Sequence, residues 1–313
     1  MSDHRSMPSL LLFSMLAILS SPSVAEDPIP VFVLAGQSNM VGAGRVEANP
    51  DRNGGMGSLE WLVEESPEKA RYQHLREEDG SWSSRDDVMI WYLGRTGELE
   101  PGYGANRDTI GPELGFGSVL GEACEEPVIL IKIAWGGKSI GKDFRPPSSG
   151  GEVGPNYRML VDMTKDVMRD MATHFPELEG RTFELAGIGW HQGWNDRVNQ
   201  AFNDAYEENL SNLIRDLRTE LDSPELPFVI AETGMSGKDE KHPRALSLMA
   251  AQAAVAEREE FKGNVGFVGT RAFYRAPEVS PSGQQYHWNS NAETYYLIGD
   301  AMGRRMLELC TLK

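Results

Sequence analysis

Cysteine and histidine are scarce in this chain, which has two cysteines and six histidines among its 313 residues. Two thiols are too few for a structural zinc site unless histidines lie close to them, and none lies near Cys124 or Cys310 in sequence. The sequence therefore indicates no metal site. Each cysteine lies at the end of an expected helix, and the sequence leaves open whether the two form a disulfide bond or never meet.

Positive charge is also in short supply. Lysine and arginine contribute 30 residues against 47 aspartates and glutamates, which gives a formal net charge of −17. This excess of negative charge disfavours nucleic acids and anionic membranes as partners. Hydrophobic residues make up 40% of the chain, which is enough at this length to fill a large core. The composition thus indicates a folded acidic protein, but it names no substrate and no oligomeric state.

The apolar run Ser9–Ser21 is too short to span a membrane comfortably. It follows a segment with one arginine and one histidine and precedes "SPSVA", which places small residues at Ser23 and Ala25. This order is typical of a cleaved secretory signal, with a retained anchor as the alternative. We expect residues 1–25 to be a signal peptide and the mature chain to begin near Glu26. The protein would then be secreted or periplasmic, where disulfides are permitted.

Strand-like and helix-like segments alternate along the rest of the chain. Short apolar, β-branched runs predict strands at Ile29–Leu34, Val88–Leu93, Val128–Ala134, Phe183–Trp190, Pro227–Ala231 and Asn264–Val268. Helices are expected at Tyr157–Phe175, Asn199–Leu221, Pro243–Phe261 and Ala292–Leu309. Strands separated by helices and buried on both faces form a parallel sheet between helix layers. We therefore expect an α/β three-layer sandwich that forms one domain over residues 26–313, with Arg45–Gly111 as loops and short elements over one end of the sheet.

The first expected strand ends in "GQSN", which places Ser38 at its carboxyl end. That edge of a parallel sheet is where α/β proteins bind their ligands. A lone serine there is more often ordinary turn chemistry, since glycine and asparagine favour turns. A nucleophilic serine needs a base to accept its proton and donors to stabilise an oxyanion. Ser38 is therefore a candidate nucleophile only if such partners exist.

Two of the six histidines lie where a site at the sheet edge could use them. His191 closes the strand Phe183–Trp190, and His287 lies on a loop that enters the last helix. Such element ends commonly carry functional residues. The remaining histidines lie in the expected signal, in polar surroundings or at a helix end: His4, His74, His242 and His174. His191 and His287 are therefore the candidate bases.

Four motifs follow one another along the chain: "AGQSNM", "WGGKSI", "WHQGWND" and a histidine just before the final helix. In this order they resemble the SGNH-hydrolase superfamily, and within it the sialate O-acetylesterase-like and acetylxylan esterase branch, carbohydrate esterase family 6. The similarity runs from about Ile29 to the C-terminus. It implies a three-layer α/β/α flavodoxin-like fold, removal of acetyl groups from sugars, and no requirement for a metal or an organic cofactor.

Carried over to this sequence, the resemblance makes Ser38 the nucleophile and His287 the general base. It makes the backbone N–H of Ser38, the Gly136–Gly137 turn and the side-chain amide of Gln192 the oxyanion-hole donors. These roles agree with the chemistry of ester hydrolysis, since a base must move the serine proton and donors must hold the tetrahedral intermediate. Glycines suit the second task because a backbone without Cβ can approach the intermediate closely.

The sequence departs from the family pattern at both usual carboxylates. Family members usually have an aspartate three residues before the catalytic histidine, where this chain has Gln284. Many also carry a glutamate directly after "HQG", where this chain has Trp194. Asp196 and Glu232 are the two acids that could replace them. We favour Asp196 because its loop already belongs to the site. The alternative role for Asp196 is that of a turn or cap residue that pairs with Arg197.

The segment "GKSIG" at Gly137–Gly141 fits the nucleophile-elbow pattern G-x-S-x-G and offers Ser139 as another nucleophile. An elbow must lead directly into a helix. The residues that follow, "KDFRPPSSGGEVGP", predict a loop instead. We therefore rank Ser139 below Ser38.

Three functions remain open from the sequence. We favour a secreted serine esterase that removes O-acetyl groups from a carbohydrate, with Trp194 and Trp288 lining the sugar pocket. The replaced carboxylates motivate a second hypothesis, a carbohydrate-binding protein of this fold with little or no activity. The third is an α/β-hydrolase-type esterase that uses Ser139. The expected partner is an acetylated sugar or polysaccharide, with no nucleic acid and no membrane after signal cleavage, and the sequence does not identify the sugar.

Overall fold

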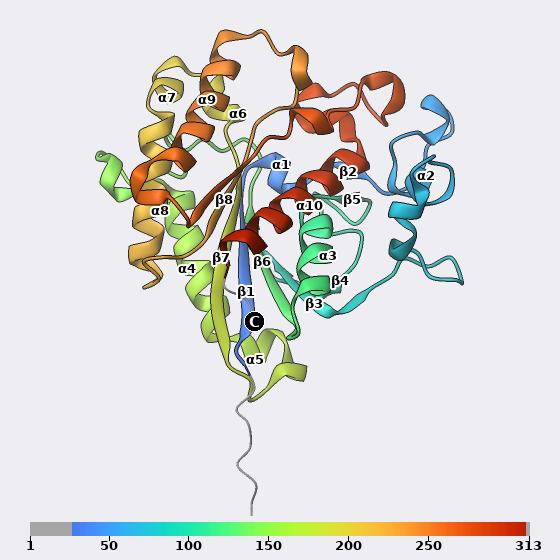
Figure 1. Ribbon diagram of the computed structural model, residues 1–313, viewed down its shortest axis with the longest axis horizontal. Coiled ribbons are helices and arrows are strands. Elements are labelled where there is room, and N and C mark those ends of the chain that lie inside the picture. Colours follow the sequence, from blue (N-terminus) through green and yellow to red (C-terminus); the bar gives the residue numbers. More distant parts are fainter. Residues whose placement is uncertain (1–26, 311–313) are drawn as a thin grey trace, which may run out of the picture.

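A seven-stranded, mostly parallel sheet forms the centre of the protein. The computed structural model describes residues 27–310, so the expected signal peptide lies outside the described residues (Figure 1). The strand order is β4-β3-β6-β1-β7-β8-β9, and β4 runs antiparallel to β3. The strands are β1 (Ile29–Gly36), β3 (Arg85–Tyr92), β4 (Arg95–Leu99), β6 (Val128–Ala134), β7 (Phe183–His191), β8 (Phe228–Ala231) and β9 (Val265–Val268). A second, two-stranded sheet joins β2 (Gly44–Arg45) and β5 (Thr109–Ile110).

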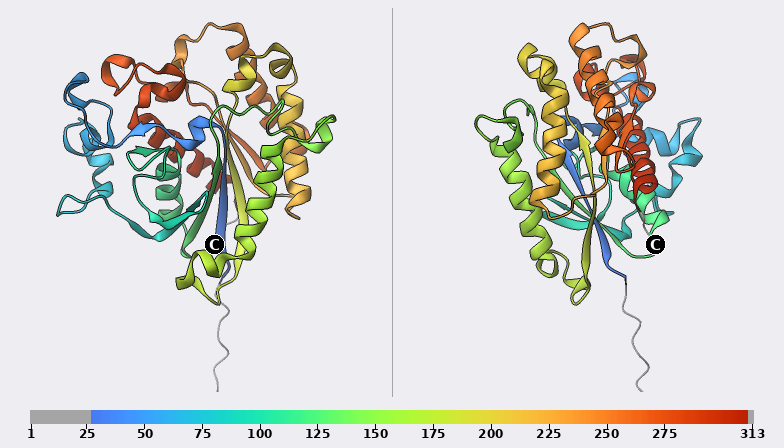
Figure 2. Two further views of the ribbon diagram at one scale, coloured as in Figure 1. Left: turned by 180° about the vertical axis from the view of Figure 1, so that it is seen from behind. Right: turned by 60° about the vertical axis from the view of Figure 1, so that its left-hand side comes forward.

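Helices cover both faces of the large sheet. They are α1 (Ser38–Val41), α2 (Leu59–Glu64), α3 (Glu113–Ala123), α4 (Pro155–Arg169), α5 (Met171–His174), α6 (Trp194–Arg197), α7 (Gln200–Asp204), α8 (Tyr206–Glu220), α9 (Pro243–Glu257) and α10 (Ala292–Leu309). Helices α4, α8 and α9 supply the core of one face, and α3 and α10 supply the core of the other. Figure 2 shows α4 and α8 on one side of the sheet and α10 on the other. The expected α/β sandwich is therefore confirmed.

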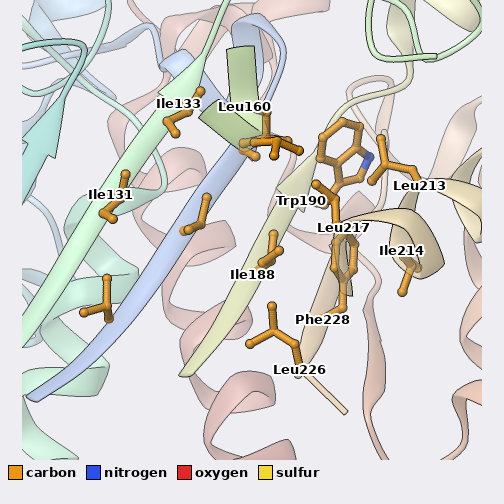
Figure 3. Packing of buried hydrophobic residues seen from close by; sticks show 14 of the residues in the cluster. Ile131, Ile133, Leu160, Ile188, Trp190, Leu213, Ile214, Leu217, Leu226 and Phe228 are labelled. Atoms are coloured by element: carbon orange, nitrogen blue, oxygen red, sulfur yellow. The ribbon is translucent and has the colours of Figure 1, made fainter. Parts of the chain in front are cut away.

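Strand β1 is apolar at every position because both of its faces are covered. In β1, Val31 and Val33 point into one core layer, whereas Phe32 and Leu34 point into the other, and all four side chains are fully buried. The first layer, shown in Figure 3, includes Ile131, Ile188, Trp190, Leu160, Leu213 and Leu217. Within residues 27–310, no helix is long and apolar enough to cross a membrane.

Two predicted helices are interrupted in the structure. The helix expected at Tyr157–Phe175 breaks at Asp170, whose φ and ψ of −103° and 24° separate α4 from α5. The helix expected at Asn199–Leu221 divides into α7 and α8 at Ala205. Strand β4 was not predicted, because as an edge strand with one neighbour it needs few apolar residues. The overall layering is unaffected by these differences.

The two cysteines follow the ends of two helices, as expected. Cys124 is the C-terminal cap of α3, and Cys310 is the C-terminal cap of α10. Both thiols are free in the structure, so no disulfide joins them.

The carboxyl ends of three neighbouring strands, β1, β6 and β7, meet at one edge of the sheet. Gly36 at the end of β1 pairs with Ala134 of β6 and with His191 of β7. A Cβ atom on Gly36 would lie 2.3 Å from the carbonyl oxygen of His191, so this close approach requires glycine. The segments that follow the three strands therefore start side by side, and they contain most of the predicted site residues.

Candidate active site

Ser38 begins the short helix α1 directly after β1. The N–H of Gln37 donates to the carbonyl of His191, 3.1 Å away, and fixes the turn between strand and helix. Ser38 is half-buried. Neither its hydroxyl nor its backbone N–H takes part in a hydrogen bond to any residue of the described chain. The serine therefore presents an unused hydroxyl and an unused N–H at the edge of the sheet.

The loop that carries His287 is hydrogen-bonded to the segment that carries Ser38. Asn39 Nδ2 donates to the carbonyl oxygen of Tyr286 at 3.2 Å, across 247 positions of sequence. The hydroxyl of Tyr295 lies 3.0 Å from Asn39 Oδ1 and 3.3 Å from the carbonyl oxygen of His287. These bonds join the residues that flank Ser38 and His287, so the predicted nucleophile and base share one rim of the molecule. Within residues 27–310, no hydrogen bond links the Ser38 hydroxyl to the His287 ring itself.

The backbone after His287 is strained. Trp288, Asn289 and Ser290 have φ values of 52°, 54° and 56°, a left-handed conformation that asparagine tolerates but that costs residues such as tryptophan and serine about 1–2 kcal/mol each. The surroundings impose it: Trp288 and Asn289 are fully buried, and Asn289 Nδ2 donates to the carbonyl of Arg275 at 2.9 Å. The loop therefore holds His287 in a position that its own backbone preferences would not select.

Burial lowers the pKa of His287 below its ordinary value. No carboxylate of the described residues forms a hydrogen bond or an ion pair with the ring. The imidazole is therefore neutral at pH 7 and free to accept a proton. His191, the other candidate base, is fully buried against Trp288, and burial lowers its pKa to about 4. It cannot reach a substrate.

Asp196 does not support His287, contrary to the prediction. Its carboxylate is fully buried and accepts hydrogen bonds from the N–H groups of Ile140 and Gly141 and from Gln192 Nε2, at 2.9, 2.8 and 2.6 Å. Burial raises its pKa to about 6, so it is ionised at neutral pH. It does not pair with Arg197 either. Asp196 instead anchors the loop after β6 to the loop after β7.

Glu232, the alternative acid, also lies away from His287. Its carboxylate is buried and accepts hydrogen bonds from the N–H groups of Thr270 and Arg271, at 2.9 and 3.3 Å. The side chain of Arg271 forms an ion pair with it at 3.0 Å. Glu232 thus ties the end of β8 to the loop after β9. Neither predicted acid reaches the imidazole.

Gln192 is not an oxyanion donor in this structure. Its side chain is fully buried, and its amide nitrogen lies 2.6 to 3.3 Å from three acceptors, which are Asp196 Oδ2, Lys138 O and Gln37 Oε1. An amide nitrogen has two hydrogens, so none is left for a substrate. Gly136 and Gly137, the other predicted donors, are exposed, and Gly137 has the left-handed φ of 68°. Their N–H groups make no hydrogen bond within residues 27–310, as an oxyanion site requires.

Asn195 is a candidate donor that was missed in the sequence. Its Nδ2 donates to the carbonyl of Gly137 at 2.7 Å, which leaves one amide hydrogen unused. Gln37 holds Asn195 from the other side, because Gln37 Oε1 accepts the N–H of Asn195 at 3.3 Å and Gln37 Nε2 lies 3.5 Å from Asn195 Oδ1. The half-buried Asn195 thus lies between the turn of Ser38 and the glycine turn. The polar residue at the second position after "HQG" is the signal that could have identified Asn195 from the sequence.

The two predicted sugar-binding tryptophans have different environments. Trp288 is fully buried, so it cannot line a pocket, and this prediction is wrong. Trp194 is half-buried, and its ring lies 6.0 Å from the exposed ring of Tyr286, between centroids. Tyr286 precedes His287 in the chain. An aromatic surface at this rim therefore exists, but it uses Tyr286 in place of Trp288.

Ser139 does not have the geometry of a nucleophile elbow. It is buried, and its hydroxyl donates to Asp143 Oδ2 at 2.9 Å. The chain continues in turns and a 3₁₀ segment, and the next α-helix begins only at Pro155. The ranking of Ser139 below Ser38 agrees with this geometry. No group of three or more metal-ligating side chains occurs among the described residues.

Comparisons with known proteins identify a family for this chain. Residues 28–308 match the model of the SASA family, described as carbohydrate esterase, sialic acid-specific acetylesterase. No protein with curated annotation matches the sequence significantly. The fold is similar to that of a protein from Arabidopsis thaliana, with a TM-score of 0.59 and 17% identity over 90% of this chain and 98% of the other. A carbohydrate acetylesterase from Xanthomonas citri is similar with a TM-score of 0.48 and 13% identity, over 88% of this chain and 56% of the other.

Proposed function

Because the chain belongs to the SASA family of carbohydrate esterases, we propose that it is a serine esterase that removes O-acetyl groups from carbohydrates through an acetyl-enzyme on Ser38. The observation that carries this assignment is the hydrogen bond from Asn39 to the carbonyl of Tyr286. It joins the neighbour of Ser38 to the neighbour of His287, and so brings a hydroxyl and a neutral imidazole to one rim.

The proposed reaction uses His287 twice. The ring accepts the Ser38 proton while Oγ attacks the acetyl carbonyl carbon, and a tetrahedral intermediate forms. When the intermediate collapses, the bond to the sugar oxygen breaks, and His287 returns the proton to that oxygen. Water then attacks the acetyl-serine with His287 again as base, and acetate leaves. The serine hydroxyl is regenerated.

Three sets of donors support the proposed oxyanion hole. They are the free N–H of Ser38, the N–H groups of the exposed Gly136–Gly137 turn, and the unused amide hydrogen of Asn195. Each such donor contributes roughly a hundredfold or more to the rate when it is aimed at the developing charge. Asn195 takes the place that the sequence assigned to Gln192.

Among residues 27–310, the proposed catalytic pair has no carboxylate as a third member. A histidine without a carboxylate can still act as a base, but its imidazolium form is stabilised less during the reaction. This is also the observation that favours the second candidate function, a carbohydrate-binding protein with little or no activity. A measurement of turnover separates the two.

The test is hydrolysis of p-nitrophenyl acetate by the wild type, Ser38→Ala and Ser139→Ala. We expect a fall in kcat of about a thousandfold or more for Ser38→Ala, because the nucleophile is lost. Ser139→Ala serves as the matched control and should retain activity within about threefold, since its hydroxyl bonds only Asp143. Loss of activity in Ser139→Ala alone would reject Ser38 as the nucleophile. An inactive wild type would favour the carbohydrate-binding protein.

We also propose that the protein is exported and cleaved near Ala25. The support is the order of charged, apolar and small residues in the first 25 positions. Sequencing the N-terminus of the protein recovered outside the cytoplasm tests this proposal. An intact Met1 there would reject cleavage.

A further inference from the structure

Two aromatic rings form an exposed surface beside the proposed base. Tyr286 is 43% exposed, and Trp194 is half-buried. Their ring centroids lie 6.0 Å apart, and the ring planes are inclined by 42°. The two rings thus form one aromatic surface, here called the aromatic trough.

The aromatic trough is continuous with the proposed catalytic residues. The ring of Tyr286 contacts the imidazole of His287, with 4.6 Å between centroids, and its carbonyl is held by Asn39 beside Ser38. Trp194 directly precedes Asn195 in helix α6. One side of the trough therefore borders the base, and the other borders the proposed oxyanion donor.

Arg197 braces the trough without giving it a free charge. Its guanidinium carbon lies 3.9 Å from the centre of the Trp194 ring and covers one face of that ring. Arg197 also pairs with Glu240 at 3.9 Å, so its positive charge is balanced. The uncovered part of Trp194 and the ring of Tyr286 therefore present an apolar surface to which Arg197 adds no unbalanced charge.

We propose that the aromatic trough binds a pyranose ring of the acetylated substrate by stacking. A pyranose has faces made of C–H groups, which pack on aromatic rings, while its hydroxyls remain at the rim in water. The proposal rests on the proposed function, because it assigns the sugar of that reaction a position.

The first experiment compares two acetyl esters, a fully acetylated methyl xylopyranoside and ethyl acetate, which has no ring. For Tyr286→Ala and Trp194→Ala we expect kcat/KM for the sugar ester to fall about tenfold, through KM, and the value for ethyl acetate to change by no more than about twofold. Tyr286→Phe should retain the sugar activity because it keeps the ring. Trp82→Ala is the matched control, since Trp82 also packs against an arginine, Arg76, at 4.3 Å.

An unchanged ratio between the two esters in both alanine variants would overturn the proposal. An equal loss for both esters would also overturn it, because the rings would then act by positioning His287. The second experiment titrates Ser38→Ala with the same xylopyranoside and follows tryptophan fluorescence. Binding that weakens when Tyr286→Ala is added supports the trough even if the wild type hydrolyses neither ester, whereas no binding, or binding indifferent to both rings, rejects it.

Discussion

His287 is neutral at physiological pH because burial lowers its pKa and no described carboxylate stabilises its charged form. We predict that kcat/KM falls on the acid side with a pKa below 6.5, since only the neutral ring can accept the serine proton. Measuring kcat/KM for p-nitrophenyl acetate from pH 4 to pH 8 checks this. His287→Ala should remove most of the activity. An acid limb that persists unchanged in an active His287→Ala enzyme would assign the titration to another group.

Asp196 has three hydrogen-bond donors pointed at its two oxygens. In Asp196→Asn the new amide group must face at least one of them, so we expect a loss of about 2–4 kcal/mol in the free energy of unfolding. Urea unfolding measures it, with the exposed Asp108→Asn as the matched control for the change in charge. The activity that remains should keep the acid limb of the wild type. A shift in the acid-side pKa of the activity profile would instead indicate that Asp196 is the partner of His287.

The residues of the site differ in how far the sequence could predict them. Ser38 and His287 were identified because each lies at an element end within a motif. Gln192 and Asn195 are close neighbours in sequence, but Gly193, with a φ of 150°, turns the chain between them. The first side chain therefore enters the core and the second stays at the surface. No rule of spacing distinguishes these two outcomes.

At the scale of elements, a buried ion pair holds helix α1 in place. Lys132 of β6 and Glu113 of α3 are both buried, and Lys132 Nζ donates to Glu113 Oε2, to the carbonyl of Val41 and to the carbonyl of Tyr103, at 2.6, 2.8 and 2.6 Å. Three acceptors use all three ammonium hydrogens. Because Val41 ends the helix that Ser38 begins, the pair fixes the orientation of α1.

We predict that Lys132→Met lowers the free energy of unfolding by about 3–5 kcal/mol, because the Glu113 carboxylate stays buried without its cation. The double variant with Glu113→Gln should recover part of this loss. Urea unfolding of the two single variants and the double variant gives the coupling energy. Strictly additive losses would show that the two side chains act independently.

Helix and strand limits were predictable where burial imposes them. The strands β1 and β6 are apolar except at Lys132 because helices cover both faces, and this pattern is visible in the sequence. The break at Asp170 was not visible, because the apolar spacing continues through it to Met171. Apolar periodicity reports which side chains face the core, and it does not report whether the backbone between them remains helical.

At the scale of the whole molecule, the buried His191 makes stability depend on pH. Its pKa is about 4 in the folded protein and about 6.5 in the unfolded chain, so the unfolded state binds the proton first as the pH falls. Above pH 6.5 the His191 ring is neutral in both states, and its full contribution to the free energy of unfolding is present. This contribution is lost as the pH falls from 6.5 to about 4. The loss is about 3 kcal/mol. Asp196, whose pKa is raised to about 6, acts in the opposite direction over the same window.

The difference between wild type and His191→Gln isolates the histidine, because Asp196 is common to both. We predict that this difference in the free energy of unfolding shifts against the wild type by about 3 kcal/mol between pH 6.5 and pH 4. Urea unfolding at several pH values measures it. A difference that stays constant with pH would mean that folding does not lower the pKa of the ring.

The architecture was predictable as a whole because alternating strands and helices leave few ways to bury both faces of a sheet. The alternation does not specify which loops touch at the sheet edge. The contact between Asn39 and Tyr286 depends on where α10 returns across the sheet, and this follows from side-chain packing. The family resemblance, and no local pattern, linked Ser38 to His287.

The three left-handed residues after His287 have a consequence for protein engineering. A backbone held in an unfavourable conformation relaxes when the contacts that hold it are removed. The histidine therefore cannot be grafted onto another scaffold by itself. A transplant would have to carry the enclosed indole of Trp288, the amide of Asn289 and the Arg275 carbonyl that receives it. The unit that positions His287 is thus this buried segment of chain, and the half-buried imidazole is only its outer part.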